Sequence, residues 1–403
     1  MNVLFLTMVQ LFDLSQKGVY TDLMCKFRDE GHKVYIVSPR ERWTGMNTSI
    51  KSIDGVHILG VRTLNIQKTG IIEKGVGQLI VGQQYKSAIK RYLKGIKFDL
   101  ILYSTPPNTL SNLIRFLKVY NYNAKTYLLL KDIFPQNAVD LGMIGKTGVK
   151  GLLYYYFRRK ERKLYTLSDH IGCMSPANIK YITEHNKEVS AEKVEEAPNS
   201  YEVAQQVELT KEECDVVREQ YNLPINLPIY IYGGNLGRPQ GIPFLIQCLD
   251  NNEDRSDCYF VIVGDGTEYS KLEQWYNERK PKNVSLFHRL PKEDYDQLVR
   301  CCDVGLIFLD YRFTIPNFPS RLLSYLMEKK PIIAATDLTS DIGTIAEANG
   351  YGFWCPSNDV AAFSKCVNKM LVSNIKQMGE AGYQFYLNNY TVEHTYNAIM
   401  KHF

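Results

Sequence analysis

The sequence predicts an α/β protein made of two doubly wound, Rossmann-like domains that face each other across a cleft. Short apolar runs alternate with amphipathic helical patterns along the whole chain, which is typical of parallel strands joined by crossover helices. With 403 residues, the chain is long enough for two domains of about 200 residues each. In the second half, two apolar runs end in glycine-rich turns, at 233–241 and 264–267. Such turns at the ends of neighbouring parallel strands lie at one edge of a sheet, where open α/β sheets bind ligands.

The first half opens with a βαβ unit. An apolar run at 3–9 precedes a helical pattern at 19–30 and a second apolar run at 34–38, so parallel strands with a right-handed crossover are expected. His32 follows this helix and is interpreted as a capping residue rather than a catalytic group. Residues 65–78 are rich in glycine and lysine and are expected to form a mobile loop. Further strands are expected at 56–59, 98–104, 126–130 and 169–175, and further helices at 78–93, 109–119 and 146–163.

The sequence Ala-Pro-Asn-Ser at 197–200 is the expected hinge between the two halves. We therefore expect one domain over residues 1–198 and a second over 199–385, with a C-terminal helix at 386–403 that packs back on the first domain. Strands of the second half are expected at 228–232, 259–263, 284–287, 303–309 and 332–335. Helices are expected after Gly241 through Leu249, around Leu272 and Trp275, and at 209–221, 292–302, 320–328 and 361–385.

Charge is distributed unevenly between the halves. Residues 1–200 carry 29 Lys and Arg against 17 Asp and Glu, whereas the remainder carries 19 against 26. A basic half suggests that this half faces an anionic partner. The helix at 146–163 combines basic and aromatic residues, which indicates either contact with an anionic membrane surface or an ordinary solvated basic face. No nucleic-acid-binding motif is present, so nucleic acid is not the expected partner. The basic candidates for membrane or acceptor contact are Lys150, Arg158, Arg159, Lys160, Arg162 and Lys163.

The beginning of the chain and the cysteines point to a cytoplasmic protein. The first residues are apolar without a basic leader and Asp13 interrupts them, so a strand is expected rather than a signal peptide. No apolar run is long enough to predict a transmembrane helix. The nine cysteines have no metal-like spacing and are expected to be reduced, mostly buried thiols.

Three sequence blocks, taken together, resemble the two-domain glycosyltransferases of the GT-B fold, and more narrowly the large retaining GT4 type that includes bacterial capsule and O-antigen transferases. The blocks are Gly-Gly-Asn-Leu-Gly at 233–237, Gly-Asp-Gly at 264–266, and Pro-Ser-Arg-Leu-Leu-Ser-Tyr-Leu at 319–326 followed by Lys-Pro-Ile-Ile-Ala at 330–334. Lys-Asp-Ile-Phe-Pro-Gln at 131–136 also resembles a segment of the subgroup that transfers amino sugars.

The resemblance implies a nucleotide-sugar donor, with UDP preferred, held by the C-terminal domain, and an acceptor held by the N-terminal one. It implies a hexosyltransferase that retains the anomeric configuration without a metal or other cofactor, because positive side chains and helix dipoles act on the leaving diphosphate. The implied donor-binding residues are Gly18, Gly234, Asn235, Gly237, Gly264, Gly266, Arg289, Ser320 and Ser324.

The chain departs from the family pattern at the donor site. Asn235 and Gln240 stand where the family often has an arginine and a lysine, and Pro316 and Ser324 stand where it often has two glutamates. Arg321 is therefore the first choice for binding the diphosphate, because arginine forms forked contacts with phosphate.

Two further residues are candidates for catalysis. Arg238 is the second choice for the diphosphate, with a solvent-exposed turn residue as the alternative. Asp132 is expected to orient the acceptor or the donor sugar, or alternatively to be a helix N-cap before Ile133.

These observations together predict a retaining glycosyltransferase that extends a lipid-linked saccharide in bacterial surface polysaccharide assembly. We expect it to lie at the inner face of the cell membrane as a peripheral protein. Missing glutamates fit a donor with fewer hydroxyls, such as an N-acetylated or deoxy-amino sugar. The alternatives are a GT-B transferase with a soluble acceptor, an epimerase-like relative, and a non-catalytic GT-B partner subunit.

Overall fold

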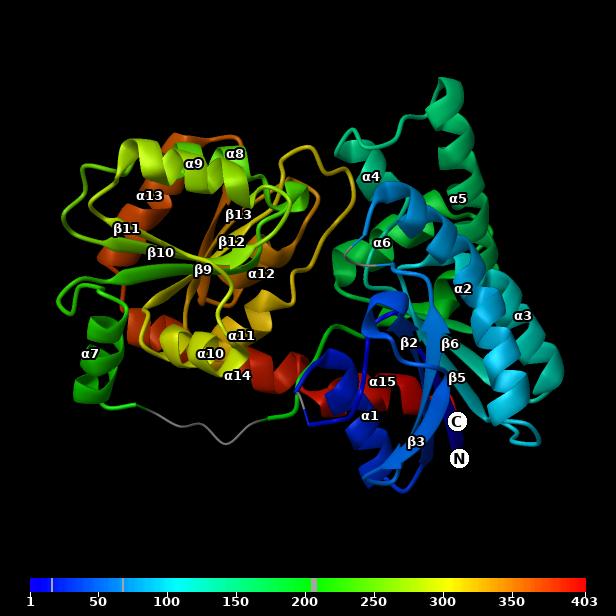
Figure 1. Ribbon diagram of the computed structural model, residues 1–403. Helices are drawn as coiled ribbons and strands as arrows, with labels where there is room; N and C mark the ends of the chain where they lie inside the picture. Colours follow the sequence, from blue (N-terminus) through cyan, green and yellow to red (C-terminus); the bar gives the residue numbers. More distant parts are fainter. Residues whose placement is uncertain (16, 67–68, 204–208) are drawn as a thin grey trace. The chain divides into compact units, whose positions relative to one another are not determined.

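The computed structural model describes residues 1–15, 17–66, 69–203 and 209–403 (Figure 1). The chain forms two compact units, the first made of Met1–Glu202 with Thr391–Phe403 and the second of Val203–Tyr390. Each unit has its own sheet, and all but one of the strand pairs are parallel, which confirms the predicted fold class. The unit boundaries follow residues 202 and 390, against predicted boundaries after 198 and 385.

The first unit is built on an eight-stranded sheet in the order β3-β4-β2-β1-β5-β6-β7-β8. Strands β3 and β4 are antiparallel and the other neighbours are parallel. Two of the strands, β3 and β8, are not in the sequence prediction. The strands are β1 (Asn2–Leu6), β2 (Lys33–Glu41), β3 (Ser49–Ile53), β4 (Val56–Thr63), β5 (Leu100–Ser104), β6 (Lys125–Leu129), β7 (His170–Cys173) and β8 (Val194–Glu196).

The helices of the first unit correct the prediction of a loop at 65–78. Helix α2 already begins at Ile71, and residues 67–68 of the predicted loop lie outside the described residues. Because it has no side chain, Gly77 lets the helix pass close to the preceding chain. A Cβ at Gly77 would lie 3.1 Å from the side chain of Ile66 and 3.2 Å from the carbonyl oxygen of Asn65. The helices are α1 (Val19–Asp29), α2 (Ile71–Tyr92), α3 (Ser111–Tyr120), α4 (Gln136–Asp140), α5 (Gly148–Leu167), α6 (Pro176–His185) and α15 (Val392–Met400).

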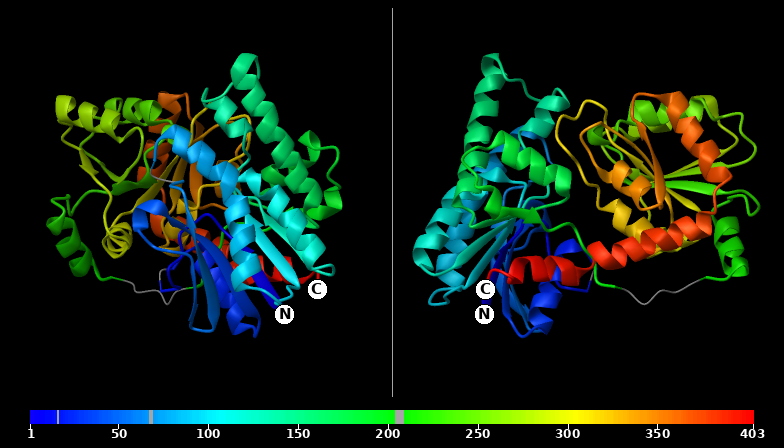
Figure 2. Two further views of the ribbon diagram at one scale, coloured as in Figure 1. Left: turned by 45° about the vertical axis from the view of Figure 1, so that its right-hand side comes forward. Right: turned by 180° about the vertical axis from the view of Figure 1, so that it is seen from behind.

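Helix α15 at the end of the chain belongs to the first unit, where both termini lie (Figure 2). It packs on α1, and Lys26 forms an ion pair with Glu393. His32 shares a hydrogen bond of 2.9 Å between Nε2 and the hydroxyl of Tyr396. The backbone N–H of His32 also donates to the carbonyl of Phe27, which closes α1. The capping role predicted for His32 therefore belongs to its backbone, while its side chain holds α15.

The second unit is built on a six-stranded parallel sheet in the order β11-β10-β9-β12-β13-β14. The strands are β9 (Ile229–Asn235), β10 (Tyr259–Asp265), β11 (Val284–Phe287), β12 (Val304–Phe308), β13 (Ile332–Thr336) and β14 (Gly352–Pro356). Strands β9, β10 and β11 follow one another toward one edge of the sheet, and β12, β13 and β14 follow one another toward the other edge. The strand order thus reverses between β9 and β12, and ligands of doubly wound folds bind at the carboxyl edge of such a point.

The helices predicted for the second unit are present except near its end, and α12 is an additional helix whose range was not predicted. Two helices replace the single one expected at 361–385, because Asn374 interrupts the run and its side chain accepts the N–H of Gln377. The helices are α7 (Lys211–Gln220), α8 (Ile242–Asp250), α9 (Tyr269–Arg279), α10 (Lys292–Arg300), α11 (Arg321–Met327), α12 (Ile342–Ala348), α13 (Val360–Leu371) and α14 (Ile375–Asn389).

Two of the sequence-based expectations concern the whole chain. Within the described residues, no helix has the length and apolar character needed to cross a membrane. The cysteines are free thiols, and all but Cys25 and Cys214 are buried, as the sequence predicts.

Candidate functional site

The predicted glycine turn begins later than expected, because Gly233 and Gly234 still belong to β9, whose end lies at the carboxyl edge of the second sheet at the point of reversal. Gly234 has φ of +121°, a conformation that residues with a Cβ rarely adopt. A Cβ at this position would lie 3.5 Å from Nη2 of Arg321. The turn therefore places backbone next to the guanidinium of Arg321, the residue that the sequence favours for diphosphate binding.

Gly264 and Gly266 are required by packing between the two glycine turns. A Cβ on Gly264 would lie 2.1 Å from the carbonyl oxygen of Gly234, and a Cβ on Gly266 would lie 2.5 Å from the backbone of Leu236. The N–H of Leu236 donates to the carbonyl of Asp265 at 2.9 Å. These glycines thus join the two turns to each other, so their presence does not by itself require a phosphate nearby.

Arg321 is the first residue of α11, and its guanidinium lies against the ring of Tyr232, with Cζ 4.3 Å from the ring centroid. Its Nη1 atom is buried and has no hydrogen-bond partner among the described residues. Burial lowers the pKa of Arg321 and the oxygens of Tyr232 and Tyr325 raise it, with a net rise. The side chain therefore stays charged and keeps a buried donor that an anion could satisfy.

Two further tyrosines hold the end of β9 beside Arg321. The hydroxyl of Tyr325 donates to the carbonyl of Ile231 at 3.1 Å and accepts the N–H of Gly233 at 3.2 Å. A Cβ at Gly233 would lie 1.9 Å from the hydroxyl of Tyr295. Burial raises the pKa of Tyr325 to about 12 and the pKa of Tyr295 well above its usual value, so both hydroxyls are neutral.

Sequence reasoning missed both tyrosines. Tyr325 lies four residues after Arg321 and so shares its helix face, which is a usable signal. Tyr295 comes from α10 and has no local signal, because only the tertiary structure brings it to Gly233.

The positions that depart from the family pattern have partners within the turn. Asn235 Nδ2 donates to Oε1 of Gln240 at 2.9 Å, and the N–H of Gly237 donates to the same oxygen at 3.2 Å. Arg238 lies 3.7 Å from a carboxylate oxygen of Glu268, and its side chain is more than half exposed. The hydrogen bond between the side-chain amides of Asn235 and Gln240 stiffens the turn. Arg238 is not free, because it pairs with Glu268.

The remaining donor-binding candidates of the second unit lie near the same sheet edge. Ser320 is exposed at the start of α11 and its side chain makes no capping hydrogen bond, and Ser324 follows one turn later. Arg289 is exposed after β11. Asp310 supplies a carboxylate after β12, but Arg312 occupies both of its oxygens at 2.8 and 2.7 Å.

Asp132 follows β6 in the first unit and has an unusual environment. Its two carboxylate oxygens accept from Nδ2 of Asn137 at 2.7 and 2.9 Å, and burial raises its pKa to about 6. The N-cap alternative is wrong, because α4 begins at Gln136 with Pro135 as its N-cap. The adjacent Lys131, which sequence reasoning did not single out, donates to the carbonyl of Ala197 at 3.1 Å, and burial lowers its pKa to about 7.

Gly18 lies between β1 and α1 and lines a pocket of about 340 Å³. Its N–H donates to Oδ1 of Asp22 at 3.0 Å, and Oδ2 of Asp22 accepts the N–H of Glu202 at 2.9 Å. Gly18 is one of the implied donor-binding residues, and its backbone N–H is therefore already used within the protein.

The basic residues predicted on α5 separate into two groups. Arg158 forms an ion pair with Glu161, and Arg162 forms one with Glu188. Lys163 donates to the side chain of Asn112 at 3.1 Å. Lys150, Arg159 and Lys160 form no ion pair within the described part of the chain. Nor do the described residues include a group of three His, Cys, Asp or Glu that could hold a metal ion.

The sequence of the second unit matches a known protein family. Residues 215–385 match the family described as "Glycosyl transferases group 1". The probable glycosyltransferase WbjE of Pseudomonas aeruginosa is 25% identical over 332 residues, which cover 80% of this chain and 78% of that protein. The putative colanic acid biosynthesis glycosyl transferase WcaI of Escherichia coli is 27% identical over 227 residues, 56% of this chain and 54% of that protein.

Solved structures share the fold over the whole chain. Sucrose-phosphate synthase from Thermosynechococcus elongatus has a TM-score of 0.77 at 13% identity, covering 100% of this chain and 98% of that one. HepE from Anabaena, solved in complex with UDP and glucose, has a TM-score of 0.69 at 14% identity, covering 100% and 99%. At such identities the likeness shows the fold alone, which is GT-B.

Proposed function

We propose that this chain, a glycosyltransferase of the GT-B fold, transfers a sugar from a nucleoside-diphosphate donor, with UDP favoured, to a lipid-linked saccharide. The product would enter bacterial surface polysaccharide assembly at the inner face of the membrane. In support, the name of the relative WcaI refers to colanic acid biosynthesis. In support of UDP, the structural neighbour HepE was solved with that nucleotide.

The buried, unpaired Nη1 of Arg321 beside the Gly234 turn is the observation that carries this proposal. A buried donor without a partner costs free energy, and a diphosphate oxygen would complete it. When the bond between the sugar and the diphosphate breaks, negative charge grows on the leaving oxygen. A guanidinium already in place stabilises that charge without reorganisation and without a metal ion.

Arg238 and Asp132 have supporting roles in the proposal. Arg238 would leave the buried carboxylate of Glu268, which keeps its ion pair with Lys271, and add a second positive charge near the diphosphate. With a pKa of about 6, Asp132 is ionised at neutral pH and can accept a hydrogen bond from a sugar hydroxyl. The same proposal includes that the transfer retains the anomeric configuration of the donor sugar.

The donor sugar is proposed to be N-acetylated or a deoxy-amino sugar. Pro316 and Ser324 stand where the family often has glutamates, so two acceptors for sugar hydroxyls are missing. Turnover rates with UDP-N-acetylglucosamine and UDP-glucose at equal concentration test this. Faster turnover of UDP-glucose would contradict it.

A thermal-shift panel with UDP, GDP and inorganic phosphate tests the donor site itself. UDP at one hundred times its Kd should stabilise the protein by about 2.7 kcal/mol. The variant Arg321→Ala should lose most of this shift. The control Arg279→Ala, at the C-terminal end of α9 and so at the opposite sheet edge, should keep it. If no nucleotide raises the melting temperature of the unmodified protein, the chain is a non-catalytic partner subunit instead.

A further inference from the structure

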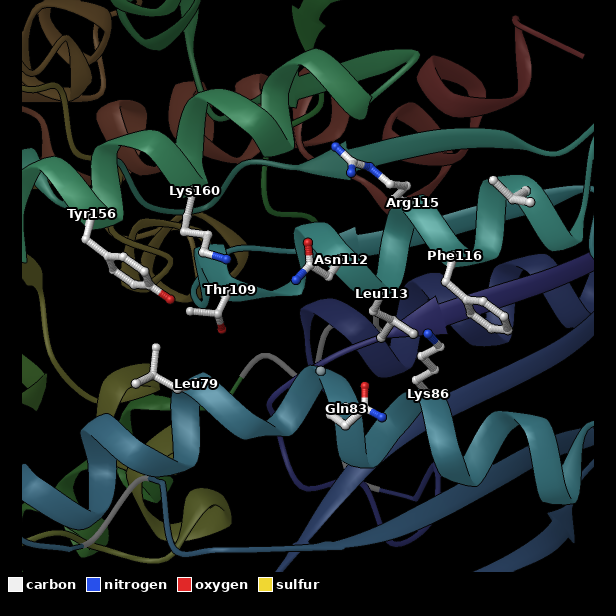
Figure 3. Close-up of a pocket in the computed structure, with 12 residues that line it drawn as sticks. Leu79, Gln83, Lys86, Thr109, Asn112, Leu113, Arg115, Phe116, Tyr156 and Lys160 are labelled. Atoms are coloured by element: carbon white, nitrogen blue, oxygen red, sulfur yellow. The ribbon is translucent and has the colours of Figure 1, made fainter.

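A groove on the first unit lies between α2, α3 and α5 and has a volume of about 520 Å³ (Figure 3). Lys86 of α2, Arg115 of α3 and Lys160 of α5 line it, together with the apolar side chains of Leu79 and Phe116. A neighbouring hollow of about 590 Å³ shares Arg115 and Lys160 with the groove and adds Arg159 and Lys163. Three helices that are separate in sequence thus place their basic side chains together.

The positive charge of this groove is not compensated within the described residues. No Asp or Glu lines either hollow. Lys86, Arg115 and Lys160 take part in no ion pair, in contrast to Arg158 and Arg162 on the other faces of α5. Burial and then the like charges of the surrounding basic residues, Arg115, Lys160 and Arg159, lower the pKa of Lys163. Basic side chains that are held together against their mutual electrostatic repulsion indicate a site for an anionic ligand.

Aromatic side chains position the ammonium groups. Lys86 Nζ lies 4.7 Å from the ring centroid of Phe116, and Lys160 Nζ lies 5.4 Å from that of Tyr156. Such contacts with a ring face reduce the freedom of long side chains without neutralising them. The cations therefore remain available to a ligand and are already directed into the groove, as Figure 3 shows for Lys86 and Lys160.

Exposed apolar side chains surround the same groove. Leu79 of α2 and Val119 of α3 line it and are 50% and 77% exposed, and Leu152 of α5, one helical turn before the lining residue Tyr156, is 73% exposed. Large apolar side chains next to uncompensated basic ones are typical of surfaces that lie in the headgroup region of a bilayer. A soluble phosphate compound would use the charges but would leave these apolar residues in water.

We propose that the groove between α2, α3 and α5 binds the phosphate of an anionic phospholipid through Lys86, Arg115 and Lys160, with the exposed apolar side chains of these helices in the headgroup region. This inference rests on the proposed function for its purpose, which is to hold the enzyme where a lipid-linked acceptor lies. It also differs from the predicted membrane contact in the residues that it uses. Arg158 and Arg162 are used for ion pairs within the fold, whereas Lys86 and Arg115 come from helices outside 146–163.

Vesicle sedimentation of the full chain tests the proposal. The probes are vesicles of phosphatidylcholine alone and vesicles of phosphatidylcholine with an equal part of phosphatidylglycerol, at low salt. We expect binding only to the second kind, weakening as salt is added. The triple variant Lys86→Gln/Arg115→Gln/Lys160→Gln should bind at least tenfold more weakly.

Two controls separate the groove from net charge. The triple variant Lys33→Gln/Lys51→Gln/Lys187→Gln removes the same charge from exposed positions outside the groove and should bind within twofold of the unmodified chain. Arg162→Gln removes a paired charge from α5 and should also bind normally. Leu152→Asn, a change at an exposed side chain that leaves the fold intact, should weaken binding to the anionic vesicles severalfold.

The outcomes distinguish this proposal from the proposed function. If the anionic vesicles bind no better than neutral ones, or if the groove variant binds as well as its charge-matched control, the groove proposal is wrong. Displacement by inorganic phosphate at the lipid phosphate concentration would reassign the groove to a free phosphate, and displacement by a short RNA would reassign it to nucleic acid.

The UDP thermal shift of the groove variant should be unchanged, which also shows that it is folded. If the unmodified chain binds anionic vesicles as expected but shows no thermal shift with UDP, the donor site is refuted and the groove proposal still holds.

Discussion

Arg321 shows how one residue can be inferred from sequence and then given its chemistry by the structure. The sequence places it at the start of a helix after a proline turn, in a family block. The structure adds the ring of Tyr232 under its guanidinium and a buried donor atom without a partner. A charged group in this position is poorly explained by stability, because a buried unsatisfied donor is destabilising. The proposed role in anion binding would account for it.

Replacing Arg321 should therefore lower catalysis more than stability. For Arg321→Ala, kcat/KM should fall by about 10² to 10³, the effect typical of removing one donor to a developing oxyanion. Arg321→Lys should recover only part of this loss, since lysine lacks the planar fork that meets two phosphate oxygens. Steady-state kinetics measure both variants. A change in KM alone, with kcat intact, would show that Arg321 binds the donor without acting on the leaving group.

Asp132 should make stability depend on pH. Burial raises its pKa from 3.8 to about 6, so the folded state disfavours the ionised form. At low pH the carboxyl is protonated in both states and has no effect. Between about pH 4 and pH 6 the unfolded chain loses the proton first, and stability falls as pH rises. The loss is complete above pH 6.

Asp132→Asn should consequently stabilise the protein at pH 7.5, by up to about 3 kcal/mol, and much less at pH 4.5. Urea unfolding at the two pH values measures the difference, and Asp254→Asn, at an exposed position, is the control. The same variant should lose activity if Asp132 orients a sugar hydroxyl. An equal gain at both pH values would mean that ionisation is not the cause.

The ends of β9 and β10 and the turns that follow them form one structure, because Gly264 and Gly266 fit against the backbone of Gly234 and Leu236. This explains why glycine recurs at both strand ends better than separate phosphate contacts would, since a Cβ on Gly264 or Gly266 would overlap the neighbouring turn. A ligand would thus meet two turns that are already fixed. Binding at such a preorganised edge needs little ordering of the protein.

Gly264→Ala should therefore destabilise the second unit by about 1 to 3 kcal/mol, the usual cost of overpacking, and weaken UDP binding at the same time. The matched control is Gly75→Ala in α2, where a Cβ meets nothing within 4 Å and the backbone is helical. This control should stabilise by about 0.5 to 1 kcal/mol, because alanine suits a helix better than glycine. Thermal unfolding with and without UDP measures both effects. Normal UDP binding by Gly264→Ala would show that the turns move independently.

The first unit contains both the N-terminal and the C-terminal residues of the chain, and the second unit lies between them in the sequence. Residues 391–403 supply α15, whose Val392, Tyr396 and Ile399 join the core cluster of the first unit. Glu195 of β8 holds the final residues, accepting from Lys401 Nζ at 2.6 Å and lying 2.9 Å from His402 Nε2. The first unit is therefore incomplete until the whole chain has been made.

Ile399→Ala should test this arrangement. Its side chain is fully buried, so its removal should lower the free energy of unfolding of the first unit by about 2 to 4 kcal/mol. Phe403→Ala, at a partly exposed position nearby, should cost less than about 1 kcal/mol. The UDP thermal shift should persist in both, because the turns and Arg321 lie in the other unit. A loss of UDP binding in Ile399→Ala would show that the two units unfold together.

The alternation of strands and helices, the two units, the glycines that end β9 and the choice of Arg321 as the candidate for diphosphate binding all come from the sequence alone. These follow from local periodicity, from turns that need glycine, and from blocks that are contiguous in the chain. Two predictions from local pattern were wrong: a loop was expected where α2 begins, and one helix was expected where α13 and α14 lie.

Which polar groups are available to a ligand depends on contacts that the tertiary structure makes. It placed Tyr295 beside Gly233, buried Asp132 against Asn137, and occupied the N–H of Gly18 with Asp22. On α5 it paired Arg158 and Arg162 with carboxylates, and it left the groove basic through residues of three helices. The physical reason is that helical periodicity fixes the face of a side chain, whereas its partner comes from a distant part of the chain. Whether a charge is neutralised or free depends on that partner.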